Sequence, residues 1–252
     1  MLNKTAGIII IGDEVLSGKV EDINSGFAAR GLRLKGIDVR RISVISDDVD
    51  EIAAETTAFS KKYDYVFTSG GLGPTHDDVT IEGISKGFGV GIAIEDDLKA
   101  ILTAHYGDKL TPERLKMAEV PETSELIKHS SIKFPIIRYK NVYILPGQPE
   151  LFKDKFKVLT ETLYDERPIL LVKVYITEYE SEIAPFLNVI VAENKAVKIG
   201  SYPVMHNADY RVMLTLESMD TDSLRHAVQM MIGGDFKDKI LKVEWGGADG
   251  NR

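Results

Sequence analysis

The stretch Thr68-Ser69-Gly70-Gly71-Leu72-Gly73-Pro74-Thr75-His76-Asp77-Asp78-Val79-Thr80 decides the fold that this chain is expected to adopt. The mostly apolar run Tyr63–Phe67 before it predicts a short buried strand, and Ile81, Ile84 and Phe88 after it recur at the spacing of an amphipathic helix. The glycines therefore lie where a strand turns into a helix. Glycine tolerates positive φ at such a turn, and the unpaired N–H groups at the start of the helix attract anions. We expect a phosphate-binding turn at the carboxyl end of this strand.

The N-terminal part shows the same alternation of strand and helix. Thr5–Gly12 is a nearly continuous apolar run closed by glycine, as in a strand that is buried on both faces of a parallel sheet. Asn24 is suited to cap a helix that ends near Gly36, and Ile37–Ile45 follows as a second strand. This spacing predicts right-handed crossovers and an α/β fold, a three-layer sandwich around a mostly parallel sheet. Ligands of such sheets bind beyond the carboxyl ends of the strands.

The rest of the chain predicts further elements of the first domain and then a second, small α+β domain. Arg167–Pro168 is the expected boundary, because a polar link containing proline precedes a new apolar run there. We therefore expect a first domain over residues 1–167, a second over 168–245 and a disordered, glycine-rich tail over 246–252. Pro185 inside a helical pattern predicts a kink or a late helix start. The further expected helices cover 96–106, 112–118, 149–163, 178–191 and 221–232, and the further expected strands cover 132–137, 142–145, 169–176, 196–201 and 210–216.

Composition limits the kind of protein. The chain has 252 residues, of which 44% are hydrophobic and 28% charged, as is ordinary for a globular protein. No apolar run approaches the roughly 20 residues of a membrane span, and the N-terminus lacks the zones of a signal peptide, so we expect a cytoplasmic protein without membrane association. Because cysteine is absent, a metal would be held by oxygen or histidine. The net charge of -8 argues against nonspecific binding to nucleic acid but is compatible with a small anionic ligand held by amides and a cation.

Two other stretches place reactive groups at strand ends. Gly12-Asp13-Glu14-Val15-Leu16-Ser17-Gly18 follows the first strand, and Tyr143-Ile144-Leu145-Pro146-Gly147-Gln148-Pro149-Glu150 leads from a later strand into a helix. If the first and third strands lie near the centre of the sheet, Asp13 or Glu14 can converge with the Asp77–Asp78 pair on one cation. Carboxylate and phosphate oxygens together suit magnesium. The later stretch adds a third segment to the same rim.

Each of these patterns also has a structural interpretation, which the sequence leaves open. Glycines after a strand are often turn geometry alone, Pro146–Gly147 included, and acids before a helix are often caps. Asp47–Asp48 most simply caps a helix through Phe59, and His76 is most simply a loop residue. The sequence contains neither a Walker Gly-Lys-Ser/Thr motif nor a GxGxxG fingerprint, which argues against an ATPase and against the usual dinucleotide-binding fold.

Taken together, the quoted motifs resemble a known family. Gly70–Thr80, Gly12–Gly18 and Asp22-Ile23-Asn24-Ser25 resemble the molybdopterin-binding-like domain of the CinA competence-damage family, which is related to MogA and MoaB. Met117-Ala118-Glu119-Val120-Pro121 is similar to a further stretch of that family, and Ile144–Glu150 is similar to its proline-glycine turn. The C-terminal part resembles the KH-like domain that follows in CinA. The resemblance spans roughly residues 5 to 240 and implies the fold described above.

The resemblance implies a metal-dependent hydrolase that cleaves the pyrophosphate of a nucleotide sugar or dinucleotide, ADP-ribose or FAD. It implies Mg2+ or another divalent cation (Co2+ or Ni2+) and no protein nucleophile, because a hard cation neutralises phosphate oxygens and activates water. Asp78 and Asp13 take the catalytic roles, and the metal-ligand candidates are Asp13, Glu14, Asp47, Asp77 and Asp78. The substrate-binding candidates supply amides, hydroxyls and the rim of the pocket: Gly12, Ser17, Gly18, Asn24, Ser69, Gly70, Gly71, Gly73, Pro74, Thr75, Thr80, Pro146 and Gly147.

Departures from the family pattern keep other functions open. Ser130–Ile137 replaces the family's usual stretch, the KH-like part has an acidic charge balance and lacks a GxxG clamp, and no room is left for a nicotinamide mononucleotide deamidase domain, whose activity we expect to be absent. One alternative is a protein of molybdenum-cofactor synthesis that binds a phosphorylated pterin and transfers an adenylyl group. Another is a non-catalytic nucleotide-binding scaffold. The resemblance also implies a homo-oligomer, a dimer or a trimer, whereas the acidic balance and the missing clamp argue against a nucleic-acid partner.

Overall fold

The structure is a computed structural model that describes residues 4–163, 169–205, 207–234 and 236–246. The chain divides into two compact units, residues 1–164 and 165–252. The boundary expected at Arg167–Pro168 lies outside the described residues. Of the tail expected over 246–252, only Gly246 is described, and it is the last residue of strand β12 (Ile240–Gly246). Among the helices of the described ranges, none is both long and apolar enough to cross a bilayer.

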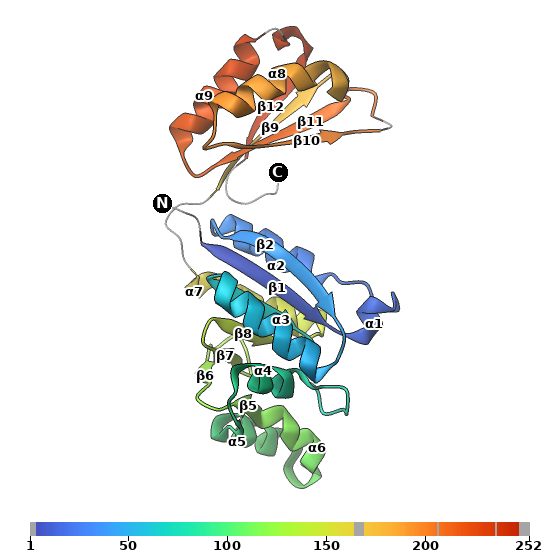
Figure 1. The fold of residues 1–252 in the computed structure, drawn as a ribbon, viewed down its shortest axis with the longest axis vertical. Coiled ribbons are helices and arrows are strands. Elements are labelled where there is room, and N and C mark those ends of the chain that lie inside the picture. Colours follow the sequence, from blue (N-terminus) through green and yellow to red (C-terminus); the bar gives the residue numbers. More distant parts are fainter. Residues whose placement is uncertain (1–3, 164–168, 206, 235, 247–252) are drawn as a thin grey trace. The chain divides into compact units, whose positions relative to one another are not determined.

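The first unit is built around a six-stranded sheet with the strand order β2-β1-β3-β8-β7-β6 (Figure 1). β2, β1, β3 and β8 run parallel, whereas β7 is antiparallel to β8 and β6 is antiparallel to β7. This confirms the predicted α/β fold and places the first and third strands side by side inside the sheet. The strands are β1 (Thr5–Ile11), β2 (Asp38–Ile45), β3 (Tyr65–Ser69), β6 (Glu125–Ile127), β7 (Ile136–Tyr139) and β8 (Val142–Leu145).

Helices cover both faces of this sheet and complete the three layers (Figure 1). The residues of β1 alternate between two cores, as expected of a strand with both faces buried. Ile8 and Ile10 belong to the core completed by α2 and α7, whereas Ile9 and Ile11 belong to the core completed by α3, α4 and α5. The helices are α1 (Asp13–Leu16), α2 (Asn24–Leu34), α3 (Val49–Lys62), α4 (Thr80–Phe88), α5 (Asp96–Tyr106), α6 (Pro112–Leu115) and α7 (Pro149–Thr162).

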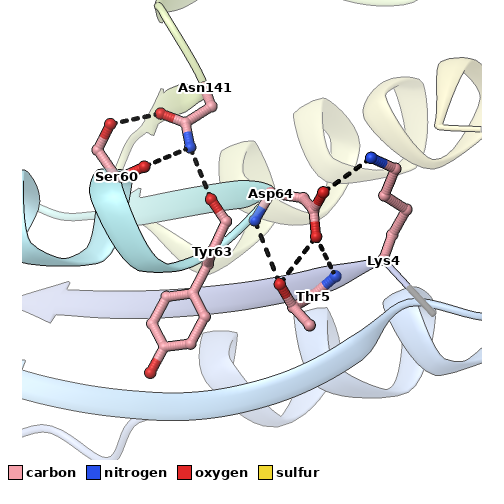
Figure 2. A network of polar contacts seen from close by, with 6 residues as sticks. All are labelled: Lys4, Thr5, Ser60, Tyr63, Asp64 and Asn141. Carbon is pink, nitrogen blue, oxygen red and sulfur yellow. Dashed lines mark hydrogen bonds and ion pairs between the residues drawn. The ribbon is translucent and has the colours of Figure 1, made fainter. Parts of the chain in front are cut away.

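A carboxylate fastens the start of β1 to the start of β3 (Figure 2). Asp64 accepts hydrogen bonds from the Lys4 Nζ at 2.7 Å, the Thr5 N–H at 2.8 Å and the Thr5 hydroxyl at 2.9 Å. These hydrogen bonds lower the pKa of Asp64 to about 2. The bond from Lys4 is the largest cause, and the bond from the Thr5 N–H is the next largest. The negative charge of Asp64 at the amino end of the sheet is therefore paired with Lys4 and hydrogen-bonded by Thr5.

A second polar contact joins the β7–β8 turn to the end of α3 (Figure 2). The Asn141 side-chain amide donates to the Ser60 carbonyl at 3.0 Å and to the Tyr63 carbonyl at 2.8 Å, and its oxygen accepts the Ser60 hydroxyl. These bonds satisfy carbonyl groups that the end of a helix leaves free. The parallel strands β3 and β8 are therefore locked in register at this end.

Some segments of the first unit differ from the sequence-based prediction. The strand expected over 132–137 is displaced to β7, and the helix expected over 112–118 divides into α6 and a 3-10 turn, η2 (Lys116–Ala118). β6 was not predicted, nor was a separate two-stranded sheet of β4 (Ile92–Ile94) and β5 (Glu119–Pro121). The reason is physical, since strands of three residues are too short to show the alternation on which the prediction depends.

The second unit is an antiparallel sheet with the strand order β10-β11-β9-β12, and α8 and α9 share its core. β12 was not predicted, because Leu241 and Trp245 are about half exposed and the strand lacks a buried apolar alternation. The helix with Pro185 begins at Glu180, two residues later than expected, and continues through the proline. The remaining elements are β9 (Leu170–Ile176), α8 (Glu180–Glu193), β10 (Lys198–Pro203), β11 (Val212–Ser218), α9 (Thr221–Gly233) and a 3-10 turn, η3 (Lys237–Lys239).

Candidate functional site

Three strand ends meet at the glycine turn, residues 70–73. The Gly70 N–H donates to the Leu145 carbonyl at 3.1 Å, which joins the end of β3 to the end of β8. A Cβ on Gly70 would lie 1.9 Å from the carbonyl oxygen of Ile11, and a Cβ on Gly147 would lie 3.2 Å from the Gly70 Cα. Gly70 and Gly71 have φ values of 121° and 61°, which L side chains rarely adopt. Glycine is required here by both conformation and space.

The loop after the glycine turn is closed by its own side chains. The Thr80 hydroxyl donates to the Gly70 carbonyl at 2.9 Å, and the Thr80 N–H donates to the Gly71 carbonyl. One carboxylate oxygen of Asp78 accepts both the N–H and the hydroxyl of Thr75. A Cβ on Gly73 would lie 2.5 Å from the same oxygen, so Asp78 packs directly on the turn. We expected Thr75 and Thr80 to donate their hydroxyl groups to a phosphate. Both hydroxyls instead donate within the loop, to Asp78 and to the Gly70 carbonyl.

Asn24 lies under this turn with one polar atom unsatisfied. Its amide nitrogen donates to the Ser69 hydroxyl at 3.0 Å and to the Gly147 carbonyl at 2.8 Å, and Ser69 in turn donates to the Pro146 carbonyl. Asn24 is 6% exposed, and its side-chain oxygen has no hydrogen-bond partner among the described residues. A buried acceptor without a donor costs about 1–3 kcal/mol. The described residues therefore leave one buried acceptor under the glycine turn without a donor.

The expected role of Asn24 as a helix cap is wrong. The residue before the first turn of α2 is Ile23, and no side-chain cap bond comes from it. The Asp22 carboxylate instead accepts the N–H groups of Asn24 and Ser25 at 3.0 Å each. Because Asp22 caps the helix, the Asn24 side chain is released to face β3 and β8.

Carboxylates of three segments share one neighbourhood beside the turn. Asp47 accepts the Asp13 N–H at 2.9 Å, while its neighbour Asp48 caps α3. The pKa of Asp47 is raised, and burial is the largest cause. The hydrogen bond from the Asp13 N–H lowers this pKa, but the charges of Glu14, Asp13 and Asp77 raise it further. A cation near these groups would relieve the repulsion. Across residues 4–163 and the other described ranges, however, no three His, Asp or Glu side chains form a ready-made metal centre.

Some predicted site residues lie apart from the turn. Ser17 and Gly18 follow α1 and donate back to its carbonyl groups, and a Cβ on Gly18 would meet nothing within 4 Å. Pro74 and His76 are exposed on the loop, and the Asp77 pKa is lowered chiefly by the Thr75 hydroxyl. Gly12 is buried, and the space for its Cβ is taken by the Glu14 carboxylate at 2.7 Å.

A cavity of about 840 Å3 opens on the other side of the glycine turn. Of the predicted site residues, Gly71, Gly73, Asp78 and Pro146 line it. Its other walls were missed by sequence reasoning. They come from α4, α5, η2, α7, the strands β4, β5 and β7, and the segment 131–134, which is part of the stretch that departs from the family pattern. These lining residues are Leu72, Ile81, Glu82, Ile92, Ile101, Leu102, Ala104, His105, Tyr106, Lys116, Met117, Glu119, Ser131, Ile132, Lys133, Phe134, Ile137, Leu151, Asp154 and Lys155.

Family comparisons match both units. Residues 7–165 match the family model "Probable molybdopterin binding domain", and residues 168–243 match "FAD synthase, middle domain". The second description differs from the KH-like resemblance, which stays a prediction. The glycine turn, the acids beside it and the residues that line the cavity all lie within residues 7–165, the range that the first family model matches.

Individual relatives agree with this division. A "Probable FAD synthase" of Caenorhabditis elegans is 34% identical over 252 residues, with 89% of this chain and 49% of that protein covered. "Protein Ta0487" of Thermoplasma acidophilum is 31% identical over 253 residues, with 94% and 97% covered. The crystal structure of "the protein CinA with unknown function" from Thermoplasma acidophilum is 36% identical, has a TM-score of 0.59, and covers 64% of this chain and 100% of that one. The chain spans about half the length of the FAD synthase relatives that it matches.

Proposed function

The chain belongs to the family of probable molybdopterin binding domains, and on this basis we propose that it is a nucleotide-processing enzyme that cleaves a pyrophosphate bond. The observation that carries the proposal is the glycine turn. The N–H groups of Gly71, Leu72 and Gly73 donate no hydrogen bond to any other described residue, although they lie at the crowded meeting point of three strands. Free main-chain donors at a strand-to-helix turn suit phosphate oxygens.

The acids beside the turn support a divalent cation as cofactor. Asp13, Glu14 and Asp47 would hold it from one side and Asp77 and Asp78 from the loop, with phosphate oxygens completing a shell that no three of these carboxylates form by themselves. The raised pKa of Asp47 fits this assignment, because it reflects burial together with repulsion that a cation would remove. When bound, such a cation supplies charge neutralisation at phosphate oxygens and activation of water. Mg2+ is the first choice, and Co2+ and Ni2+ are alternatives.

The side chains of this unit have separate tasks in the proposed reaction. The amides of the glycine turn bind and orient the pyrophosphate, which stabilises the charge that its oxygens gain as the bond breaks. Asp78 and Asp13 orient the attacking water. One Asp78 oxygen is fixed by Thr75, so the carboxylate is held in one orientation and its second oxygen remains for this task. The Asn24 amide, which donates to the Ser69 hydroxyl and to the Gly147 carbonyl, holds the ends of β3 and β8 together.

FAD and ADP-ribose are the substrates that we propose. Relatives named as probable FAD synthases support a flavin nucleotide, as does the match of the second unit to the middle domain of FAD synthase. A dinucleotide would place its pyrophosphate on the glycine turn and one of its halves in the adjoining cavity. The family description also favours a second candidate function, in which a phosphorylated pterin occupies the same turn and receives an adenylyl group.

The test is a product assay with FAD, ADP-ribose, NAD and ATP in the presence of Mg2+, Co2+ or Ni2+. The wild type is expected to release mononucleotides from FAD or ADP-ribose, and Asp78→Asn is expected to lower the rate by about 100-fold or more. Asparagine keeps an acceptor for the Thr75 N–H, so the loop stays closed. Asp108→Ala, at an exposed aspartate outside the site, is the matched control.

Each outcome has a defined meaning. A wild type that cleaves no pyrophosphate substrate with any of these metals rules out the hydrolase, and ATP consumption only in the presence of a pterin supports the adenylyl transferase instead. Equal rates in the wild type and Asp78→Asn would remove the role given to this carboxylate.

A further inference from the structure

Helix α7 carries a lysine on its buried face. Lys155 is 8% exposed and lies between the buried residues Phe152 and Phe156 of the same helix. Its Nζ donates to the Pro135 carbonyl at 2.8 Å and stands 5.2 Å from the centroid of the Phe134 ring. No Asp or Glu of the described residues forms an ion pair with it. Burial alone lowers the pKa of Lys155 to about 8.

A buried lysine without a counter-charge lowers the stability of the fold, so its presence at this position points to a function in binding. A buried ammonium without a counter-charge is unfavourable, and an alkyl side chain would fill the same helix face without that cost. An ammonium has three N–H donors, and the Pro135 carbonyl accounts for one. Lys155 lines the cavity of about 840 Å3, so the other donors are available to a molecule inside it.

The cavity has two chemically different ends. One end is formed by Gly71, Gly73 and Asp78 of the glycine turn and its loop, where main-chain amides are free. The wall around Lys155 has Phe134 beside the amine and Ile137 of β7 in the same lining, with Lys133 and Asp154 as its charged members. Its volume lies within the range of sites for cofactor-sized ligands. The cavity therefore fits a molecule with a phosphate at one end and a large planar ring at the other.

We propose that Lys155 is the specificity-determining residue of a flavin-ring subsite, in which Phe134 packs against the ring and Nζ donates to the ring's carbonyl oxygens. The inference rests on the proposed function, because it places the flavin half of FAD in the cavity. A donor-only group discriminates between the two halves of that molecule. The pyrimidine edge of a flavin offers two carbonyl oxygens on either side of one N–H, whereas adenine offers no carbonyl oxygen, carries an amino donor beside a ring-nitrogen acceptor, and is smaller.

Binding of half-molecules tests this subsite without turnover. FMN and AMP are titrated separately, with Mg2+, against the full chain, and FMN is followed by its own fluorescence. Lys155→Met keeps the apolar stem and is expected to weaken FMN binding by about 10- to 100-fold while AMP binding stays unchanged. Phe134→Leu is the second variant, with the same selectivity expected. Lys61→Met, which removes a charge from the exposed end of α3, is expected to bind both as the wild type does.

The alternatives give different results. A lysine that only supports the fold predicts a lower melting temperature for Lys155→Met and equal weakening of FMN and AMP, and either result overturns the proposal. A wild type that does not bind FMN also overturns it, even if ADP-ribose is cleaved. FMN binding that depends on Lys155, in a protein that cleaves no pyrophosphate, would support the subsite while the proposed hydrolase fails.

Discussion

The two ends of the sheet in the first unit treat polar groups in opposite ways. At the amino end, Asp64 receives hydrogen bonds from Lys4 and Thr5, and its pKa falls to about 2. At the carboxyl end, burial and neighbouring acids raise the pKa of Asp47, and the buried oxygen of Asn24 has no partner among the described residues. At the amino end the polar groups are satisfied within the protein, whereas at the carboxyl end the described residues leave them unsatisfied, which is what the proposed cation and ligand require.

The difference shows how one sheet separates stability from binding. Matched polar groups add to the free energy of unfolding, and unmatched groups subtract from it, so a fold retains the second kind where binding compensates for the cost. The parallel arrangement sets the position, because all carboxyl ends of β1, β3 and β8 lie at one edge. The comparison can be tested by changing each end separately.

The largest effect is expected at the glycine turn. Gly70→Ala places a Cβ 1.9 Å from the Ile11 carbonyl oxygen at a φ of 121°, and neither backbone can move aside without breaking the sheet. Strain and overpacking together are expected to lower the free energy of unfolding by about 3 kcal/mol, measured by urea denaturation. Gly18→Ala is the control, since it also has positive φ but open space, and about 1 kcal/mol is expected there. Equal losses in the two variants would mean that the crowding at the turn has no energetic weight.

The sequence was sufficient to predict the strands and helices of the first unit's sheet, but not the hydrogen bonds of the polar side chains at its two ends. Local pattern was sufficient to predict strand β1, the amphipathic helix after the glycines and the helix over 96–106, and the structure confirms all three. Asn24 was assigned to a cap because residue type alone does not show that Asp22, two positions earlier, takes that role. Lys155 gave one readable signal, an ionisable residue within the apolar stripe of Phe152, Phe156 and Leu159, but the cavity that it lines depends on tertiary packing.

A smaller effect, with a defined pH dependence, is expected at the amino end. Asp64→Asn removes the charge that Lys4 and the Thr5 N–H stabilise. A lowering of the pKa from 3.8 to about 2 corresponds to at most about 2.5 kcal/mol of stability, and because the Asp64 side chain is 35% exposed, we expect about 1 kcal/mol at pH 7. The folded-state pKa is below the unfolded one, so this contribution is present above about pH 4 and is lost as the pH falls toward 2.

Urea denaturation of the wild type and Asp64→Asn between pH 2 and pH 7 measures this difference. The two curves of unfolding free energy against pH should converge near pH 2. A gap that stays constant over the whole range would show that the loss comes from packing and not from the charge, and it would remove the electrostatic side of the comparison.

The smallest effect on stability is expected at Asp47, where the sign is reversed. Because burial and the charges of Glu14, Asp13 and Asp77 raise its pKa, ionised Asp47 is less favourable in the folded chain than in the unfolded chain. Its favourable contribution is therefore present at low pH and is lost as the pH rises through the folded-state pKa. Asp47→Asn keeps an acceptor for the Asp13 N–H, so at pH 7 the free energy of unfolding should be unchanged or slightly higher, within about 0.5 kcal/mol.

The same substitution should weaken binding of Mg2+, measured by calorimetry with a nucleotide present, because one of the repelling charges that attract the cation is gone. This pairing of unchanged stability with weaker cation binding is the opposite of what Asp64→Asn should show, since that variant is destabilised and binds as before. If Asp47→Asn instead unfolds more easily and binds Mg2+ normally, the carboxylate at the carboxyl end is structural like the one at the amino end. Asp47 would then only position Asp13 through its backbone N–H, and the case for a cation site there would rest on Asp13, Glu14, Asp77 and Asp78.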